Sequence, residues 1–186
     1  MKLLVAFLFA AAVNNERVAA TEDRLAPGET RTVPGTPALT LYLTDGKIGG
    51  SSVHRGEVVF EPRQSHIIRN TGAAEMKMVR IEFRGPGSNE TWGTAGLSPN
   101  YKVLLENRYT RVYDIRIPAG TREPQHTHHD RVVVCLSGAE LEHLMPDGRI
   151  EPSTLKTGEI AWRKGGTHIG HNLGKTDLWV IAIEPK

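Results

Sequence analysis

Two short histidine clusters are the residues of this chain whose types and spacing could do chemistry. His126 and His128 are separated by one residue, so in a strand both side chains point to the same side. His168 lies forty residues after His128, in the segment GGTHIGHN, and would have to approach from a neighbouring strand. Three neutral imidazoles can bind one divalent transition metal at about 2.1 Å, and they suit iron, manganese, nickel, copper or zinc. The pattern predicts a metal site with the ligands His126, His128 and His168.

The glycine frame around these histidines occurs twice in the chain. At a constant offset of 92 residues, Gly28 corresponds to Gly120 and Gly46 to Gly138. At an offset of 102 residues, Gly56 corresponds to Gly158, His66 to His168, Asn70 to Asn172 and Glu82 to Glu184. The change of offset falls within one loop of each copy. The chain is therefore predicted to consist of two tandem copies of one unit.

The first copy lacks most of the histidines. The offset of 92 residues places Pro34 at the position of His126 and Thr36 at the position of His128, so that only His66 remains. A single imidazole holds a metal ion poorly. We therefore expect the first copy to be free of metal and the second copy to carry the chemistry.

The elements that position these residues are predicted to be short antiparallel strands. Tyr113, Ile115 and Ile117 alternate with Asp114 and Arg116, and glycine, proline, asparagine and aspartate separate many short apolar runs. Such spacing favours an antiparallel sandwich or barrel, in which closure removes exposed sheet edges. The predicted strands are Arg24–Leu25, Thr40–Leu43, Val58–Phe60, Met76–Phe83, Val103–Leu105, Val112–Ile117, Arg131–Leu136, Ile160–Trp162 and Leu178–Ile183.

Two motifs of the second copy resemble those of the cupin superfamily, namely Gly120-X5-His126-X-His128 before Gly138, and Gly158 followed by Gly165-X2-His168-X3-Asn172. The resemblance covers nearly the whole chain, as a two-cupin protein with an eroded first copy. It implies an all-β fold of two tandem antiparallel jelly-roll barrels, usually with one metal ion at a barrel mouth. Known relatives include dioxygenases, decarboxylases, isomerases, sugar-binding regulators and seed storage proteins, so the motifs specify a fold better than a reaction.

One departure from the family pattern affects the ligand set. The family usually has a glutamate ligand after the second histidine. That place falls on Arg131 when counted from the closing glycine, and on Val132 or Val133 when counted from His128. Asp130 is the nearest acid and is a candidate for an extra ligand. The main expectation is a three-histidine site without a carboxylate, a set resembling that of thiol dioxygenases, with Arg131 either binding an anionic substrate group or capping the barrel mouth.

Other histidines are assigned no ligand role from their positions. His129 and His171 have odd spacing from the predicted ligands and should face away from them. His54 and His143 are predicted to lie in loops, exposed to solvent. These expectations confine the predicted metal site to three histidines.

The predicted domains are a degenerate cupin barrel at residues 13–88, a linker at residues 89–97 and a metal-site barrel at residues 98–186. The segment 89–97 lacks periodicity and is rich in small polar residues. Units of this size bury a limited fraction of their surface, so pairing of units within or between chains, as in a homo-oligomer, is expected.

The N-terminus and the composition bound the partners and the compartment. The apolar run within Met1–Ala12 resembles a signal peptide and predicts a periplasmic or secreted protein. The alternative interpretation is an apolar first strand, in which case the protein would be cytoplasmic. This run is too short to span a bilayer as a helix. The net charge is +2 without a basic run, so nothing points to nucleic acid. A single cysteine, Cys135, allows no intrachain disulfide.

The predicted function is that of a metal-binding cupin acting on a small molecule, and Arg131 suits an anionic one. An open metal site with three protein ligands suits an enzyme of the dioxygenase or isomerase type. The eroded first copy shows that the frame persists without a full site. A non-catalytic binding protein is therefore the alternative, and a structural role is a third.

Overall fold

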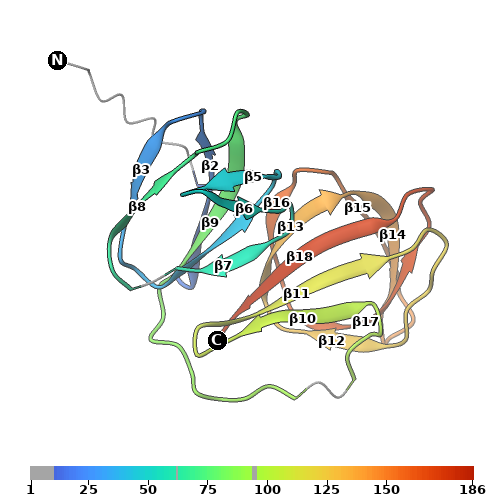
Figure 1. Ribbon diagram of the computed structural model, residues 1–186. Helices are drawn as coiled ribbons and strands as arrows, with labels where there is room; N and C mark the ends of the chain where they lie inside the picture. The colour runs from blue at the N-terminus through green and yellow to red at the C-terminus, as the bar shows by residue number, and fades with distance from the viewer. Residues whose placement is uncertain (1–10, 62, 94–95) are drawn as a thin grey trace. The chain divides into compact units, whose positions relative to one another are not determined.

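The described residues of the chain are strands, turns and loops. The structure is a computed structural model that describes residues 11–61, 63–93 and 96–186 (Figure 1). Within these ranges there is no helix, and therefore no helix long and apolar enough to span a bilayer. The chain divides into two compact units, which essentially comprise Ala19–Glu82 and Phe83–Lys186. The prediction of an all-β fold is confirmed.

The first unit contains one five-stranded sheet, in the order β1-β2-β9-β4-β7. Two further pairs, β3 with β8 and β5 with β6, are linked by an isolated bridge between Ile48 and Asn70. The strand pairs β1–β2, β3–β8, β4–β7, β4–β9 and β5–β6 are antiparallel. The strands are β1 Val13–Asn14, β2 Val18–Leu25, β3 Thr30–Val33, β4 Ala38–Tyr42, β5 Gly46–Ile48, β6 Ser51–Val53, β7 Val58–Phe60, β8 His66–Arg69 and β9 Met76–Phe83.

The second unit contains a five-stranded sheet, in the order β10-β11-β18-β13-β16, and a four-stranded sheet, in the order β12-β17-β14-β15. Two antiparallel sheets in this arrangement form a jelly roll, as the sequence motifs implied. The strands are β10 Tyr101–Glu106, β11 Thr110–Ile117, β12 His126–His128, β13 Arg131–Ser137, β14 Ala139–Leu144, β15 Ile150–Leu155, β16 Ile160–Arg163, β17 Gly166–Asn172 and β18 Leu178–Pro185.

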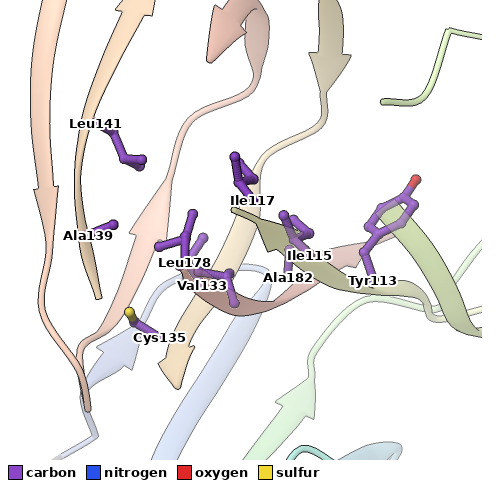
Figure 2. Close-up of a cluster of buried hydrophobic side chains, with 10 residues drawn as sticks. Tyr113, Ile115, Ile117, Val133, Cys135, Ala139, Leu141, Leu178 and Ala182 are labelled. Carbon is purple, nitrogen blue, oxygen red and sulfur yellow. The ribbon is translucent and has the colours of Figure 1, made fainter. Parts of the chain in front are cut away.

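The core of the second unit is a cluster of buried aliphatic and aromatic side chains from both of its sheets (Figure 2). Alternate residues of β11 face inward, and Cys135 of β13 is buried among them as a small hydrophobe. The cluster consists of Tyr113, Ile115, Ile117, Val133, Cys135, Ala139, Leu141, Leu178, Val180 and Ala182. Burial of this face fixes which side of each strand points inward, and so fixes the register of the strands that carry the histidines.

The two units match strand for strand, with β1–β9 corresponding in order to β10–β18. The repeated asparagines show why the frame recurs. Asn172 is fully buried, and its Nδ2 donates to the carbonyls of Ile117 and Thr176 at 2.9 Å. Asn70 makes the corresponding bonds to the carbonyls of Leu25 and Ala74 in the first unit. Each asparagine therefore satisfies backbone carbonyls that would otherwise be buried without donors.

The register of the histidine strand corrects the alignment drawn from the sequence. In the first unit Val33 pairs with His66, and in the second unit His126 pairs with His168. Since His66 and His168 are equivalent, Val33 occupies the place of His126. The assignment of Pro34 to that place was wrong by one residue, and by the same count Gly35, not Thr36, corresponds to His128.

An extra residue in the second unit causes this shift. β3 runs without interruption from the pair of Thr30 with Arg69 to the pair of Val33 with His66. In the second unit the equivalent first pair is Arg122 with His171, and one additional residue lies between it and His126. Such an insertion is a β-bulge, and after it the offset is 93 residues. Ile48, which bridges Asn70, therefore corresponds to Leu141, which pairs with Asn172, and the predicted equivalence of Gly46 with Gly138 was wrong by one residue.

Several strands were absent from the predicted set. β3, β5, β6, β8, β12, β14, β15 and β17 were not predicted, whereas β7 and β9 match the predicted ranges residue for residue. The missed strands lie in the sheets rich in polar residues and glycine, such as β17 with the sequence GTHIGHN. Composition of this kind resembles a loop because the strand signal depends on apolar alternation.

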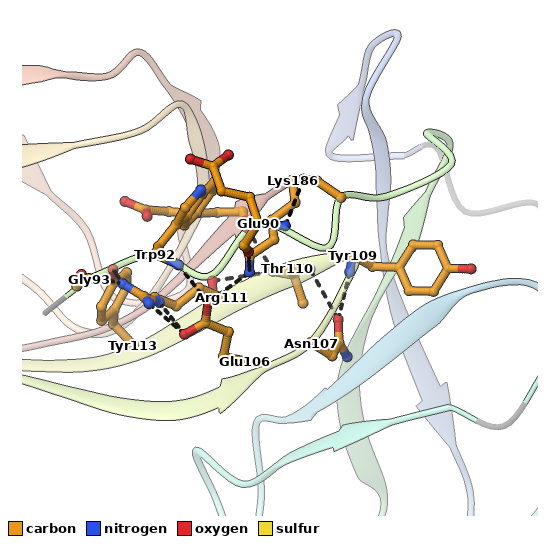
Figure 3. Close-up of polar contacts among 12 residues, drawn as sticks. Glu90, Trp92, Gly93, Glu106, Asn107, Tyr109, Thr110, Arg111, Tyr113 and Lys186 are labelled. Carbon is orange, nitrogen blue, oxygen red and sulfur yellow. Dashed lines mark hydrogen bonds and ion pairs between the residues drawn. The ribbon is translucent and has the colours of Figure 1, made fainter.

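The segment predicted as a linker is held against the second unit by a buried arginine (Figure 3). The Nε of Arg111 donates to Glu106 Oε2 at 2.8 Å, its Nη1 donates to the carbonyl of Gly93 at 2.9 Å, and Lys186 Nζ lies 2.7 Å from Glu106 Oε1. Burial would raise the pKa of Glu106, but hydrogen bonds from Lys186 and Arg111 outweigh it and lower the pKa to about 2. This network belongs to the second unit alone, because the equivalents of Glu106 and Arg111 are Asn14 and Ala19.

The expected signal peptide, Met1–Ala12, lies outside the described residues except for its last two positions. Export therefore stays a prediction. The strand β1 begins directly afterwards, at Val13.

Candidate metal centre

The three predicted ligands come together on two adjacent strands of the second unit. β12 pairs with β17 so that His126 lies directly opposite His168, and His128 follows on the same face. One ring nitrogen of each histidine lies within 4.8 Å of those of the other two. His126 and His128 are buried, and His168 is half-buried. Two ligands at about 2.1 Å from one ion lie at most about 4.2 Å apart, so a side-chain shift of less than about 1 Å would bring all three imidazoles onto one ion.

The hydrogen bond of His126 fixes which ring nitrogen is free. Its Nδ1 lies 2.9 Å from the carbonyl oxygen of Pro124 and therefore donates its proton there. The lone pair is consequently on Nε2, which lies 3.1 Å from the Nε2 of His128. Two ligands at about 2.1 Å on adjacent corners of an octahedron lie about 3.0 Å apart. The observed separation fits a pair of adjacent ligands.

The imidazoles of His128 and His168 are held in the neutral form. Burial lowers the pKa of His128 well below its ordinary value, and the positive charge of Arg131 lowers it further. Burial, followed by the neighbouring His143 and His126, lowers the pKa of His168 to about 3. Neutral imidazole is the form that binds a metal ion, so these ligands need not lose a proton near pH 7.

Gly165 of the second motif allows β12 and the start of β17 to approach closely. A Cβ atom at this position would lie 2.6 Å from the carbonyl oxygen of His128 and 3.1 Å from the amide nitrogen of Asp130. Only glycine fits without a shift of the backbone that carries the histidine. The glycine frame of the motif therefore positions the ligands directly.

Arg131 lines the same cavity as His128 and His168. This cavity has a volume of about 430 Å³, and its lining includes Tyr101, His128, Arg131, His143, Arg163 and His168. Burial lowers the pKa of Arg131, while the negative charge of Glu184 opposes this effect. A guanidinium keeps its charge even so, and the cavity is cationic on this side.

Asp130, the candidate for an extra ligand, makes other contacts. Its Oδ1 accepts a hydrogen bond from the amide of Gly165 at 2.7 Å, and its Oδ2 lies 3.1 Å from Lys164 Nζ. The group of close ligand atoms in the described part of the chain contains the three histidines without Asp130. Asp130 instead stabilises the turn that brings Gly165 against β12.

Two carboxylates that the sequence did not single out lie beside the histidines. Glu123 Oε2 is 3.9 Å from His126 Nε2, and Glu123 Oε1 accepts hydrogen bonds from Ser98 at 2.5 Å and Asn100 at 3.2 Å. Glu184 Oε1 is 3.8 Å from His128 Nδ1. Burial raises the pKa of Glu184 to about 7, despite the hydrogen bond from the His129 amide. The only sequence signal was the repetition of Glu184 at Glu82.

His143 and Tyr101 also belong to the site. The prediction of an exposed loop for His143 was wrong, because it lies in β14 opposite Gly170, and its ring centroid is 4.5 Å from that of His168. The hydroxyl of Tyr101, at the start of β10, lies 3.0 Å from His128 Nε2. Neither motif includes these residues, because Tyr101 precedes the first motif and His143 lies between the two.

Several solved structures have a fold similar to that of this chain, and one of them is described as a cupin. A cupin 2 conserved barrel domain protein from Leptotrichia buccalis is 16% identical, over 94% of this chain and 86% of its own, with a TM-score of 0.61. Salicylate 1,2-dioxygenase from Pseudaminobacter salicylatoxidans is 13% identical, over 97% and 73%, with a TM-score of 0.58. A mutant of Bacillus subtilis oxalate decarboxylase is 13% identical, over 91% and 69%, with a TM-score of 0.57. At these identities the similarity establishes the fold.

A scan against protein-family models and a search of curated proteins give no match.

Proposed function

Because the chain has the fold of the cupin superfamily, we propose that its second unit binds one divalent transition metal through His126, His128 and His168. We propose further that it acts on a small carboxylate held by Arg131, as an enzyme of the dioxygenase or isomerase type. The observation that carries this proposal is the convergence of three imidazoles, two of which line the same cavity as the half-buried guanidinium of Arg131. Each feature alone is common, and their combination suits a charged substrate at a metal ion.

The chain's own residues fit the metal. The Nδ1 of His126 donates its proton to the carbonyl oxygen of Pro124, so the lone pair on Nε2 faces the other histidines. The lowered pKa values of His128 and His168 keep the other two imidazoles neutral. All-imidazole sites suit iron, nickel, copper, zinc or manganese. When bound, such an ion supplies Lewis acidity or the activation of water or oxygen.

Arg131 and Arg163 lie opposite each other on β13 and β16, and both line the cavity. A planar guanidinium binds a carboxylate through two parallel hydrogen bonds, which would orient the substrate relative to the histidines. Two of the similar structures are named for enzymes of carboxylates, salicylate and oxalate. That likeness concerns the fold, and it supports the choice of carboxylates as the first compounds to test.

The first test measures metal content and turnover. Protein purified without a histidine tag should contain about one transition-metal ion per chain, as measured by elemental analysis. Oxygen consumption and product formation would then be followed with salicylate, oxalate and related carboxylates. Product formation with oxygen consumption supports a dioxygenase, and product formation without it supports an isomerase. Failure to bind any of the five metals would contradict the proposal.

The second test examines Arg131. Arg131→Gln should weaken carboxylate binding roughly tenfold or more, because a hydrogen bond to a charged group contributes about 1.5–3 kcal/mol. Arg131→Glu should tighten metal binding, since a fixed positive charge opposes a cation by about 4 kcal/mol per unit charge at 4 Å and an effective dielectric constant near 20. Arg149→Gln is the matched control, because Arg149 does not line this cavity and is paired with Asp147. Unchanged metal affinity in Arg131→Glu would show that the guanidinium is remote from the ion.

The second candidate function is non-catalytic binding of a small molecule. It is favoured by the first unit, which keeps the same strand order with Val33 and Gly35 in place of two histidines. Saturable binding of a carboxylate to the metal-loaded protein, without turnover, would support this alternative.

A further inference from the structure

A tyrosine hydroxyl lies among the imidazoles of the second unit. Tyr101 Oη is 3.2 Å from His126 Nε2 and 3.0 Å from His128 Nε2, and these two nitrogens are 3.1 Å from each other. The three atoms therefore form a nearly equilateral triangle. Tyr101 reaches this position from β10, the edge strand of the five-stranded sheet, whereas both histidines belong to the other sheet.

The size of this triangle corresponds to metal coordination. Ligand atoms at about 2.1 Å from an ion lie about 3.0 Å apart on adjacent octahedral corners and about 3.4 Å apart on tetrahedral corners. The three observed edges match a face of an octahedron. The ring nitrogen of His168 lies within 4.8 Å of those of His126 and His128, and it would reach a further corner after a shift of less than about 1 Å, since two such ligands lie at most about 4.2 Å apart.

Suppose that both histidines carry their lone pair on Nε2. Hydrogen bonds among Tyr101 Oη, His126 Nε2 and His128 Nε2 then cannot satisfy all three atoms. His126 Nε2 is an acceptor, because the proton of this ring is on the Nδ1 that bonds Pro124. His128 Nδ1 faces Glu184 Oε1 at 3.8 Å, and a proton on this nitrogen would leave its Nε2 as an acceptor also. The phenol of Tyr101 has a single proton to donate. A cation at the centre would satisfy the three lone pairs together.

We propose that Tyr101 Oη is a fourth ligand of the ion held by His126, His128 and His168. This inference rests on the proposed metal site and completes its ligand set with one oxygen. A bond between the metal and the phenolate oxygen forms as the O–H bond breaks. The proton leaves to water through the cavity that Tyr101 lines, and no electron is transferred. Tyr101 thus supplies the anionic oxygen ligand that neither Arg131 nor Asp130 provides.

The test uses Cu²⁺ alone as the probe, added to metal-free protein without a histidine tag. Phenolate bound to Cu²⁺ gives an intense charge-transfer absorption in the visible range, which imidazole ligands do not give. The wild-type protein should bind about one Cu²⁺ and show this band. Tyr101→Phe should still bind Cu²⁺ through the histidines, about tenfold more weakly, and should lose the band.

Tyr113→Phe is the matched control. The Tyr113 ring lies 5.9 Å from that of Tyr101, and its hydroxyl accepts a hydrogen bond from Arg111 Nη1 at 3.4 Å. It is not one of the three atoms of the triangle. This variant should keep the band at full intensity. A wild-type protein that binds Cu²⁺ without the band, or a Tyr101→Phe variant that keeps it, would overturn the role of Tyr101 and leave the three-histidine site standing. A wild-type protein that binds no Cu²⁺ would overturn the metal site itself.

Discussion

The two units of this chain share one strand order and differ in what they place at the same structural positions. The pair His126 and His168 of the second unit corresponds to Val33 and His66 of the first. Leu39 pairs with Phe60 in the first unit as Val132 pairs with Trp162 in the second. The neighbouring pair Arg131 and Arg163 therefore corresponds to Ala38 and Glu61. The fold therefore does not depend on the histidines.

The two environments also differ in charge. His66 Nε2 lies 3.1 Å from Glu61 Oε2, so the remaining histidine of the first unit has a carboxylate partner. His168 instead faces other imidazoles and the charge of Arg131, which together with burial favour the neutral ring. A metal ligand must be a neutral imidazole, and at the positions equivalent to the three ligands the first unit keeps His66 alone. The difference indicates that the second unit alone is suited to bind a cation through its histidines.

The largest expected effect separates the two units by metal content. His126→Ala should lower the metal affinity more than about a hundredfold, because even the loss of a ligand's hydrogen-bond partner costs 10–100-fold. His66→Ala in the first unit is the control and should leave the metal content unchanged. Both are measured by elemental analysis and by competition with a chelator. Equal loss of metal in the two variants would contradict the assignment of the site to the second unit.

The next comparison uses the repeated glutamates Glu184 and Glu82. Burial raises the pKa of Glu184 from 4.5 to about 7, so the folded state binds its proton more tightly than the unfolded state. The resulting stabilisation is fully present below pH 4.5 and is lost as the pH rises through 7. A shift of this size corresponds to about 3 kcal/mol in the free energy of unfolding.

Urea unfolding of metal-free protein between pH 4.5 and 8 would measure this effect. The difference in the free energy of unfolding between wild type and Glu184→Gln should change by about that amount across the range. Glu82→Gln should show no such change, because Glu82 is partly exposed and paired with Arg80. A flat difference for Glu184→Gln would mean that its carboxyl titrates normally.

The smallest expected effect concerns the glycines that let the strands approach. A Cβ at Gly35 would lie 2.7 Å from the amide nitrogen of Ser65, and one at Gly165 would lie 2.6 Å from the carbonyl oxygen of His128. Either substitution by alanine should cost about 1–3 kcal/mol of stability through overpacking. Gly165→Ala should in addition weaken metal binding, whereas Gly35→Ala should not.

Thermal unfolding and metal titration together would separate these outcomes. Gly28→Ala is a third variant for calibration, because a Cβ there meets no atom within 4 Å and its cost comes from the backbone angle φ of 77° alone. Normal metal affinity in Gly165→Ala would show that the position of β12 tolerates the shift.

The same glycine positions explain why the first unit has no counterpart of His128. Gly35 occupies that place, and its lack of a side chain is what allows the close approach to Arg63 and Ser65. In the second unit the glycine is on the opposite strand, at Gly165, so position 128 is free to carry a side chain. Which strand carries the glycine decides whether a ligand fits.

The sequence by itself determined the features that depend on local spacing. The repeated glycines and asparagines predicted two copies of one all-β unit. Each repeated residue meets a requirement of its own turn: Gly56 and Gly158 adopt positive φ values, and Asn70 and Asn172 donate hydrogen bonds to backbone carbonyls. The interval between His126 and His128 placed both on one face, because side chains alternate along a strand.

Only the tertiary structure decided which residues meet these histidines. The extra residue before His126 moved the equivalence from Pro34 to Val33, and no pattern of glycines reveals a one-residue bulge between them. Tyr101 and His143 reach the site from β10 and β14, which lie outside both motifs. Side-chain direction in a sheet has a period of two, so a single inserted residue changes which face each later residue occupies. The register that resolves this choice is set by pairing with distant strands and by burial of the core.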